Sequence, residues 1–129
     1  LKRFFDLILY FLGLRKTAII CGDSMLPTLK DGDIVFFKKY KQDESLLEIG
    51  RIVIFSHPLT KKRLIKRINI VNTNSIGVLG DNIEFSEDSN NFGLVNKEKI
   101  IGLVTSKLSN LKLKNILIQK ERRTSLNPK

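Results

Sequence analysis

The chain of 129 residues has one cysteine, one histidine and no tryptophan. A single cysteine cannot form a disulfide within the chain, so the disulfide framework of small secreted domains is excluded and the composition suits a reducing cytoplasm. One cysteine and one histidine also fall short of the ligand set of a closed zinc site. We therefore expect a cytoplasmic protein with no metal site and no other cofactor.

Long apolar runs are absent as well. The most apolar stretch, Leu7 to Leu14, is interrupted by Gly13 and is far shorter than the roughly 20 residues that cross a bilayer. Phenylalanines and basic residues surround this stretch, as they do in helices that lie on a membrane surface. We expect a helix within residues 1–16 that docks on the rest of the domain, and the pattern leaves peripheral contact with a membrane open.

Acidic residues are fewer than basic ones. The chain has 13 Asp and Glu and 23 Lys and Arg, which gives a formal net charge of +10. Such a charge favours a nucleic acid, an anionic membrane or an acidic partner without choosing among them. One alternative is therefore a non-enzymatic β-domain that binds nucleic acid. Its basic residues would be Lys38, Lys39, Lys41, Lys61, Lys62, Arg63 and Arg67. Only Tyr40 lies close to them in the sequence, so a base-stacking platform is poorly supported and we expect no nucleic-acid partner.

The hydrophobic content of 42% is enough to build one domain around one main core. Short apolar runs rich in β-branched residues alternate with turn signals, which predicts a mainly β fold, a small coiled sheet or partly open barrel. We expect this domain over residues 17–112, followed by a basic C-terminal tail over 113–129. The predicted strands are Ala18–Cys21, Asp33–Lys38, Arg51–Phe55, Arg63–Val71, Ser75–Leu79 and Ile100–Lys107.

Lys66 is the one charged residue on an apolar face of the predicted strand Arg63–Val71. Successive side chains of a strand point to opposite faces, so Lys66 shares a face with Leu64, Ile68 and Ile70. Burial disfavours an ammonium group and lowers the pKa of a lysine, which can then accept a proton from a serine hydroxyl. The alternative is an amine that extends past its apolar neighbours to water.

Ser24 lies in the segment GDSMLPTL, between an apolar strand and a proline turn, where a side chain can be presented rather than buried. A serine in such a position commonly caps a turn, and that alternative stays open. Together, however, a presented serine and a buried lysine can form the proton-transfer unit of a hydrolase.

Cys21 and His57 suggest a second nucleophile and base, the pair of a thiol protease. Cys21 ends an apolar run and is better explained as a small core residue. His57 precedes Pro58, which favours a place in a turn over contact with a substrate.

The order of several segments along the chain resembles the signal peptidase I-like serine–lysine peptidase family. GDSMLPTL resembles its nucleophile motif, KDGDIVFF and IGRIVIF the two following strands, RLIKRI the lysine strand, and GDNIEFSEDSNNFGLV the last signature segment. The resemblance implies the partly open barrel of the signal peptidase catalytic core with a short N-terminal helix. It also implies that Ser24 is the nucleophile, Lys66 the general base, Ser86 a hydroxyl that orients Lys66, and Asp88 a support for the site.

In the mechanism that the resemblance implies, Lys66 takes the proton of Ser24, which attacks a peptide carbonyl. The turn Gly22–Asp23–Ser24 holds the oxyanion through the backbone amide of Ser24. Some relatives carry a serine at the position of Gly22, so the second oxyanion donor is left unassigned. Met25 and Pro27 are expected to line the surface where the substrate enters.

Two departures from the family pattern are Arg51, where an aspartate is usual, and Asn90, where an arginine is usual. The chain also has no large insertion between the lysine strand and the GDN segment. With His57-Pro58, this compactness resembles most the small nickel-type superoxide dismutase maturation proteases. That resemblance implies a precursor protein as partner, from which an N-terminal propeptide is removed to expose the nickel-binding terminus. The alternatives are leader peptidase activity on exported preproteins and, as in related folds, self-cleavage of a repressor.

Overall fold

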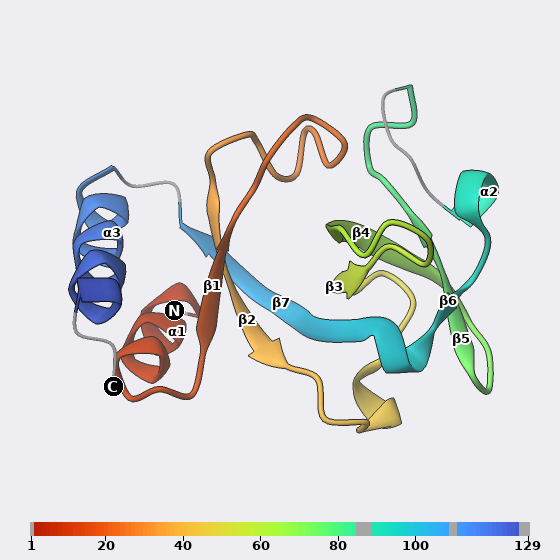
Figure 1. Ribbon diagram of the computed structural model, residues 1–129, viewed down its shortest axis with the longest axis horizontal. Helices are drawn as coiled ribbons and strands as arrows, with labels where there is room; N and C mark the ends of the chain where they lie inside the picture. The colour runs from red at the N-terminus through yellow and green to blue at the C-terminus, as the bar shows by residue number, and fades with distance from the viewer. Residues whose placement is uncertain (1, 85–88, 109–110, 127–129) are drawn as a thin grey trace.

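The computed structural model describes residues 2–84, 89–108 and 111–126, and the side chains of these residues apart from 89–90, 111–114 and 124–126. Seven strands form one antiparallel sheet in the order β1-β2-β7-β3-β4-β5-β6, which curls on itself (Figure 1). The mainly β prediction is confirmed. The strands are β1 (Lys16–Ile19), β2 (Ile34–Lys39), β3 (Ile52–Ser56), β4 (Arg63–Val71), β5 (Ser75–Leu79), β6 (Val95–Asn96) and β7 (Ile100–Leu108). The helices are α1 (Lys2–Phe11), α2 (Ser89–Phe92) and α3 (Leu111–Leu126), with short 3₁₀ helices at Glu44–Leu46 and Lys97–Lys99.

The sheet curls where its strand pairs shift register. Shifts occur between Phe36 and Phe37 in the β2–β7 pair and between Ile68 and Ile70 in the β4–β5 pair. Such bulges bend a strand and increase its twist. The shift in β4 turns Ile70 outward, where it is 44% exposed, so the expectation that Ile70 shares the buried face of this strand is wrong. Position 102 requires glycine, because a Cβ there would overlap the ring of Phe37.

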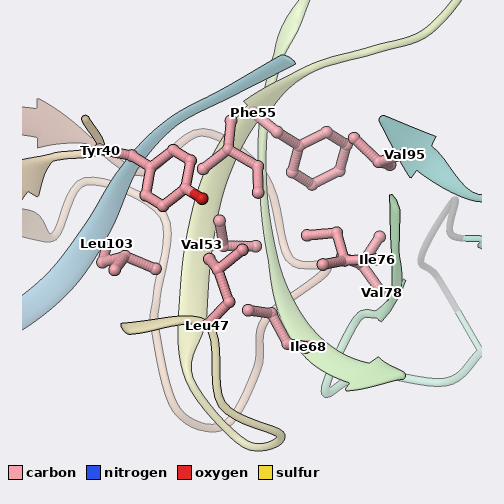
Figure 2. Close-up of a cluster of buried hydrophobic side chains, with 10 residues drawn as sticks. Tyr40, Leu47, Val53, Phe55, Ile68, Ile76, Val78, Val95 and Leu103 are labelled. Atoms are coloured by element: carbon pink, nitrogen blue, oxygen red, sulfur yellow. The ribbon is translucent and has the colours of Figure 1, made fainter. Parts of the chain in front are cut away.

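The largest cluster of buried side chains fills the inside of the curl between β3, β4, β5 and β7 (Figure 2). Its members are Tyr40, Leu47, Val53, Phe55, Ile68, Ile76, Val78, Val95, Ile100 and Leu103. Burying a side chain as large as Phe55 stabilises the fold by about 2–3 kcal/mol. This cluster supports the face of β4 that also carries Lys66.

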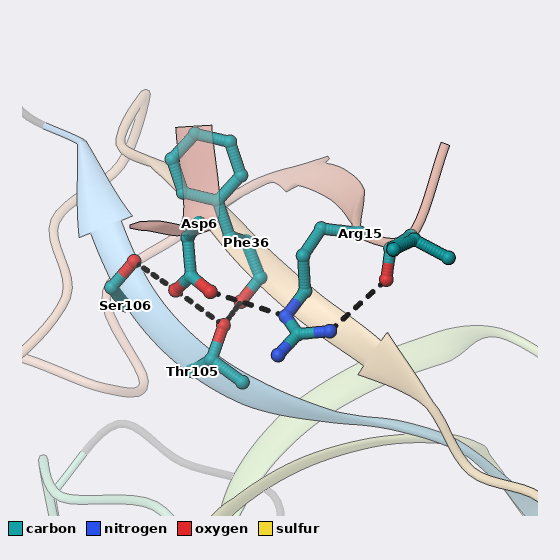
Figure 3. Close-up of polar contacts among 6 residues, drawn as sticks. Asp6, Arg15, Phe36, Thr105 and Ser106 are labelled. Atoms are coloured by element: carbon teal, nitrogen blue, oxygen red, sulfur yellow. Dashed lines mark hydrogen bonds and ion pairs between the residues drawn. The ribbon is translucent and has the colours of Figure 1, made fainter. Parts of the chain in front are cut away.

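A second cluster joins α1 and α3 to the β1–β2 end of the sheet, where the two helices lie side by side (Figure 1). The buried carboxylate of Asp6 attaches α1 to β7, because it accepts hydrogen bonds from Thr105 Oγ1 at 2.6 Å and Ser106 Oγ at 2.5 Å. Arg15 Nε lies 3.1 Å from its other oxygen (Figure 3). No helix in the described ranges has the length and apolar character needed to cross a membrane.

Helix α3 covers much of the segment for which the sequence predicted only a basic tail. Leu117 is buried against the second cluster, and the hydroxyl of Tyr10 donates to Glu121 at 2.6 Å. Both contacts join α3 to residues that are distant in the sequence, so the local composition of this segment does not predict them. The predicted domain boundaries remain predictions.

Candidate active site

Ser24 lies on the loop that connects β1 to β2, drawn in orange in Figure 1. We call residues Gly22–Leu29 the serine loop. Gly22 opens it with a φ of 87°, a conformation that favours glycine, and its N–H donates to Asp31 Oδ1 at 2.7 Å. The amide of Gly22 is therefore already engaged, so it cannot serve as the missing oxyanion donor in this conformation.

The apolar residues of the serine loop anchor it to the core. Met25 and Leu29 are both 2% exposed and pack with Ile20 and Val35. Burial of Met25 does not fit its predicted contact with substrate, because its side chain is enclosed by the domain. Pro27 is exposed, and its contact with substrate stays a prediction.

Asn82, just beyond β5, donates hydrogen bonds to the backbone carbonyl before the Ser24 N–H and to the one after it. Its N–H donates to the carbonyl of Ser24 at 2.9 Å, and its side-chain amide donates to the carbonyl of Asp23 at 3.0 Å. In a trans peptide the carbonyl and the following N–H point in opposite directions. Because the Asp23 carbonyl faces Asn82, the N–H of Ser24 points away from Asn82. This fixes the orientation of the amide that the sequence predicted as an oxyanion donor.

Asp81 connects the far end of the serine loop to β4. Its Oδ2 accepts the hydroxyl of Thr28 at 2.5 Å, and its two oxygens accept from Arg67 Nε at 2.8 Å and Nη2 at 2.7 Å. These Arg67 hydrogen bonds hold the pKa of Asp81 below its ordinary value, assisted by Thr28 and opposed by partial burial. The same bonds raise the pKa of Arg67.

A second cation completes the attachment of the loop. Lys107 Nζ, on β7, donates to the carbonyl of Thr28 at 3.0 Å. Arg67 Nη1 also donates to the carbonyl of Gly50 at 2.7 Å, next to the start of β3. The serine loop is thus held by β4, by β7 and by the segment that follows β5.

Lys66 precedes Arg67 on β4 and is 2% exposed. It lies opposite Val53 of β3, and alternation places it on the same face as Leu64 and Ile68, which contact the main core. Its predicted burial is confirmed. An amine that reaches bulk water past its neighbours is excluded, because almost none of the residue is exposed.

Residues 5–71 match the family model for "Signal peptidase, peptidase S26". The chain belongs to this family. The match covers just over half of the chain and includes both the serine loop and Lys66. Membership implies serine peptidase activity. No curated protein matches the sequence.

Two of the predicted site residues of this signal peptidase family member, Ser86 and Asp88, lie outside the described residues. Their roles as orienting hydroxyl and supporting carboxylate stay predictions. Among the residues that the structure describes, no group of three or more His, Cys, Asp or Glu side chains is placed to hold a metal ion.

The suggested thiol pair fits the signal peptidase fold poorly. Cys21 is exposed, contrary to the expectation of a core residue. The Nδ1 atom of buried His57 accepts N–H groups from Leu59 at 3.0 Å and Thr60 at 3.1 Å. The imidazole thus holds its own turn together, as the turn interpretation predicts.

Sequence reasoning missed the residues that position the serine loop in this peptidase. Asp81 and Asn82 were recognised only as part of the GDN segment, and Thr28 only as part of the segment GDSMLPTL. The alternation that identified Lys66 also places Arg67 on the opposite face of β4. The available clue was that this cation could pair with the aspartate of the GDN segment. The family match ends at residue 71, before Asp81.

Proposed function

We propose that this chain is an endopeptidase in which Ser24 is the nucleophile and Lys66 the general base. One observation carries the proposal: the loop that contains Ser24 is bound through Thr28 and Asp81 to Arg67, the residue that follows the buried Lys66 on β4. A fixed connection between the two segments is what a proton-transfer pair requires, because geometry governs the rate of such a transfer.

The proposed reaction begins when neutral Lys66 Nζ takes the proton of Ser24 Oγ. Burial supports this role because it disfavours the ammonium form. Oγ then forms a bond to the peptide carbonyl carbon, and the oxyanion accepts the N–H of Ser24. Lys66 returns the proton to the leaving amine, which breaks the peptide bond and leaves an ester on Ser24. Water, deprotonated by Lys66, then attacks the carbonyl carbon of that ester. Lys66 returns the proton to Ser24 Oγ as its bond to the carbonyl carbon breaks and the carboxylic product leaves.

Two substitutions test the pair. Ser24→Ala and Lys66→Met should each lower the rate of processing by at least about 10³-fold, because both groups act in one proton transfer. Methionine suits position 66 because it fills a buried site without a charge. Ser45→Ala, on an exposed 3₁₀ helix, is the matched serine control and should keep full activity. A folded Lys66→Met protein that processes its substrate at the original rate would refute the proposal.

We further propose that the substrate is a precursor from which a short N-terminal propeptide is removed, as in nickel superoxide dismutase maturation. Support comes from the compact site. β4 and β5 are joined directly by a turn in which Asn72 N–H donates to the Ser75 carbonyl at 2.9 Å, with no accessory domain inserted.

The substrate experiment supplies two precursors in parallel, a nickel superoxide dismutase precursor and an exported preprotein, with Ser24→Ala as the blank. Sequencing of the new N-termini should show cleavage of the first at its nickel-binding terminus. Cleavage of the exported preprotein alone would identify leader peptidase activity instead. Cleavage of neither would reject both substrate assignments.

A further inference from the structure

Helix α1 leaves an apolar stripe uncovered. Its buried face carries Asp6 and Tyr10, which attach it to the sheet and to α3. The other face, together with the turn that follows the helix, carries large apolar side chains that are between 42% and 67% exposed. This stripe consists of Phe4, Phe5, Ile8, Phe11 and Leu12. Residues at these spacings share one side of a helix, so the stripe is continuous.

A basic groove of about 590 Å³ lies beside this helix, between its C-terminal end, α3 and the sheet. Its cationic lining residues are Arg15, Lys16, Lys39, Arg63 and Lys120. Lys16, Lys39 and Arg63 are exposed and make no ion pair within the described part of the chain. Among the described residues that line the groove, only Glu121 is acidic, and it already accepts the hydroxyl of Tyr10. The groove therefore presents a concentration of positive charge to an anion.

The stripe and the groove share a border. Lys120 Nζ lies 4.7 Å from the centre of the Phe11 ring and 3.9 Å from that of Tyr10. Gly13 and Arg15, which follow the stripe in the sequence, line the groove directly. An apolar surface and a cationic site thus meet at one end of the molecule, where α1 and α3 lie together (Figure 1).

We propose that this end of the molecule docks on an anionic bilayer, with the α1 stripe among the acyl chains at the interface and a phospholipid headgroup phosphate in the groove. A bilayer complements both features at once, because it offers apolar chains directly beneath negative phosphates. A nucleic acid would neutralise the groove and leave the stripe in water. The inference is independent of the proposed peptidase activity, since none of its residues belongs to the serine loop or to Lys66.

The test is sedimentation of the full chain with vesicles of phosphatidylcholine alone and of phosphatidylcholine with phosphatidylglycerol. Phe5→Ser/Leu12→Ser removes part of the stripe, and Ile49→Ser/Leu59→Ser removes two apolar side chains elsewhere that are more exposed still. Lys39→Gln/Arg63→Gln removes two groove cations, and Lys30→Gln/Lys99→Gln removes two exposed cations away from it. Circular dichroism and thermal unfolding confirm that each variant is folded. Duplex DNA is tested with the same set.

We expect binding to the anionic vesicles only. The groove variant should bind about 20- to 30-fold more weakly, since each cation near an anionic surface contributes about fivefold. The stripe variant should lose about tenfold or more, and the two controls should lose much less. Equal losses in the groove variant and its control would overturn the headgroup site, as would undiminished binding by the stripe variant. Tight DNA binding that depends on the groove but not on the stripe would assign the groove to nucleic acid instead.

Discussion

The hydroxyl of Thr28 lies 2.5 Å from the carboxylate of Asp81, which joins the serine loop to the segment after β5. Arg67 holds the same carboxylate from β4, so three segments distant in the sequence meet at one side chain. This contact holds the serine loop relative to β4. In the proposed mechanism, Asp81 and Thr28 would act as positioning residues for Ser24.

Thr28→Val should therefore lower the turnover number while leaving the domain folded. Valine keeps the shape of threonine but cannot donate to Asp81, and a small displacement of a reacting group can reduce the rate by about 10- to 100-fold. Steady-state kinetics on a peptide substrate would show a fall in kcat with little change in KM, and Thr28→Ser should restore much of the rate. Thr73→Val, at an exposed turn position, is the control. Unchanged kcat in Thr28→Val would remove the positioning role.

The Asp81 contacts should also make stability depend on pH in a defined range. Hydrogen bonds from Arg67 lower the pKa of Asp81 below its ordinary 3.8, so the folded state favours the ionised form. The resulting stabilisation is fully present above about pH 3.8 and is lost as the pH falls through the lower pKa of the folded state.

Urea unfolding of the wild type and Asp81→Asn between pH 2 and pH 7 would measure this effect. We expect the wild type to be more stable by about 1–2 kcal/mol at neutral pH, with the difference shrinking only below about pH 4. A difference that grew on acidification would contradict the assignment.

Removal of the Asp6 carboxylate should destabilise the whole domain. Asp6→Ala leaves Thr105, Ser106 and Arg15 without their common acceptor, at a cost of about 2–4 kcal/mol. Thermal unfolding checks this, with Glu98→Ala as an exposed acidic control expected to change stability by less than about 0.5 kcal/mol. Equal melting temperatures for the two variants would mean that this network contributes little.

Docking of α3 can be tested with two neighbouring positions. Leu117 is buried and Ile116 is half exposed, although they are adjacent and similar in size. Leu117→Ala should cost about 2–4 kcal/mol through loss of burial and creation of a cavity, whereas Ile116→Ala should cost less than about 1 kcal/mol. Similar costs in chemical unfolding would show that α3 does not pack as observed.

The strands were largely predictable because their signals are local. Alternating and β-branched runs placed β3, β4, β5 and β7 within a residue or so, and the burial of Lys66 followed from alternation alone. Alternation failed at Ile70, because a bulge shifts the facing of every residue beyond it and pairing with another strand decides where it forms.

The candidate site was predictable only in part. The pattern around Ser24 and Lys66 indicated the two groups that we propose to be reactive, whereas nothing near Thr28 indicated that Asp81 would be its partner. A side-chain hydrogen bond between residues far apart has no periodicity, so it is visible only when the chain has folded. The burial of Met25 depended in the same way on packing against Ile20 and Val35.

By itself, the sequence determined a small, basic, mainly β domain with a serine on a connecting loop and a lysine on an apolar face, because composition and alternation act over a few neighbouring residues. Only the tertiary structure decided how the serine loop is held, that α3 packs beside α1, and that an apolar stripe borders a basic groove. Each of these three features depends on which segments meet in space. The segments that meet are determined by burial and hydrogen bonding over the whole chain rather than within a few neighbouring residues.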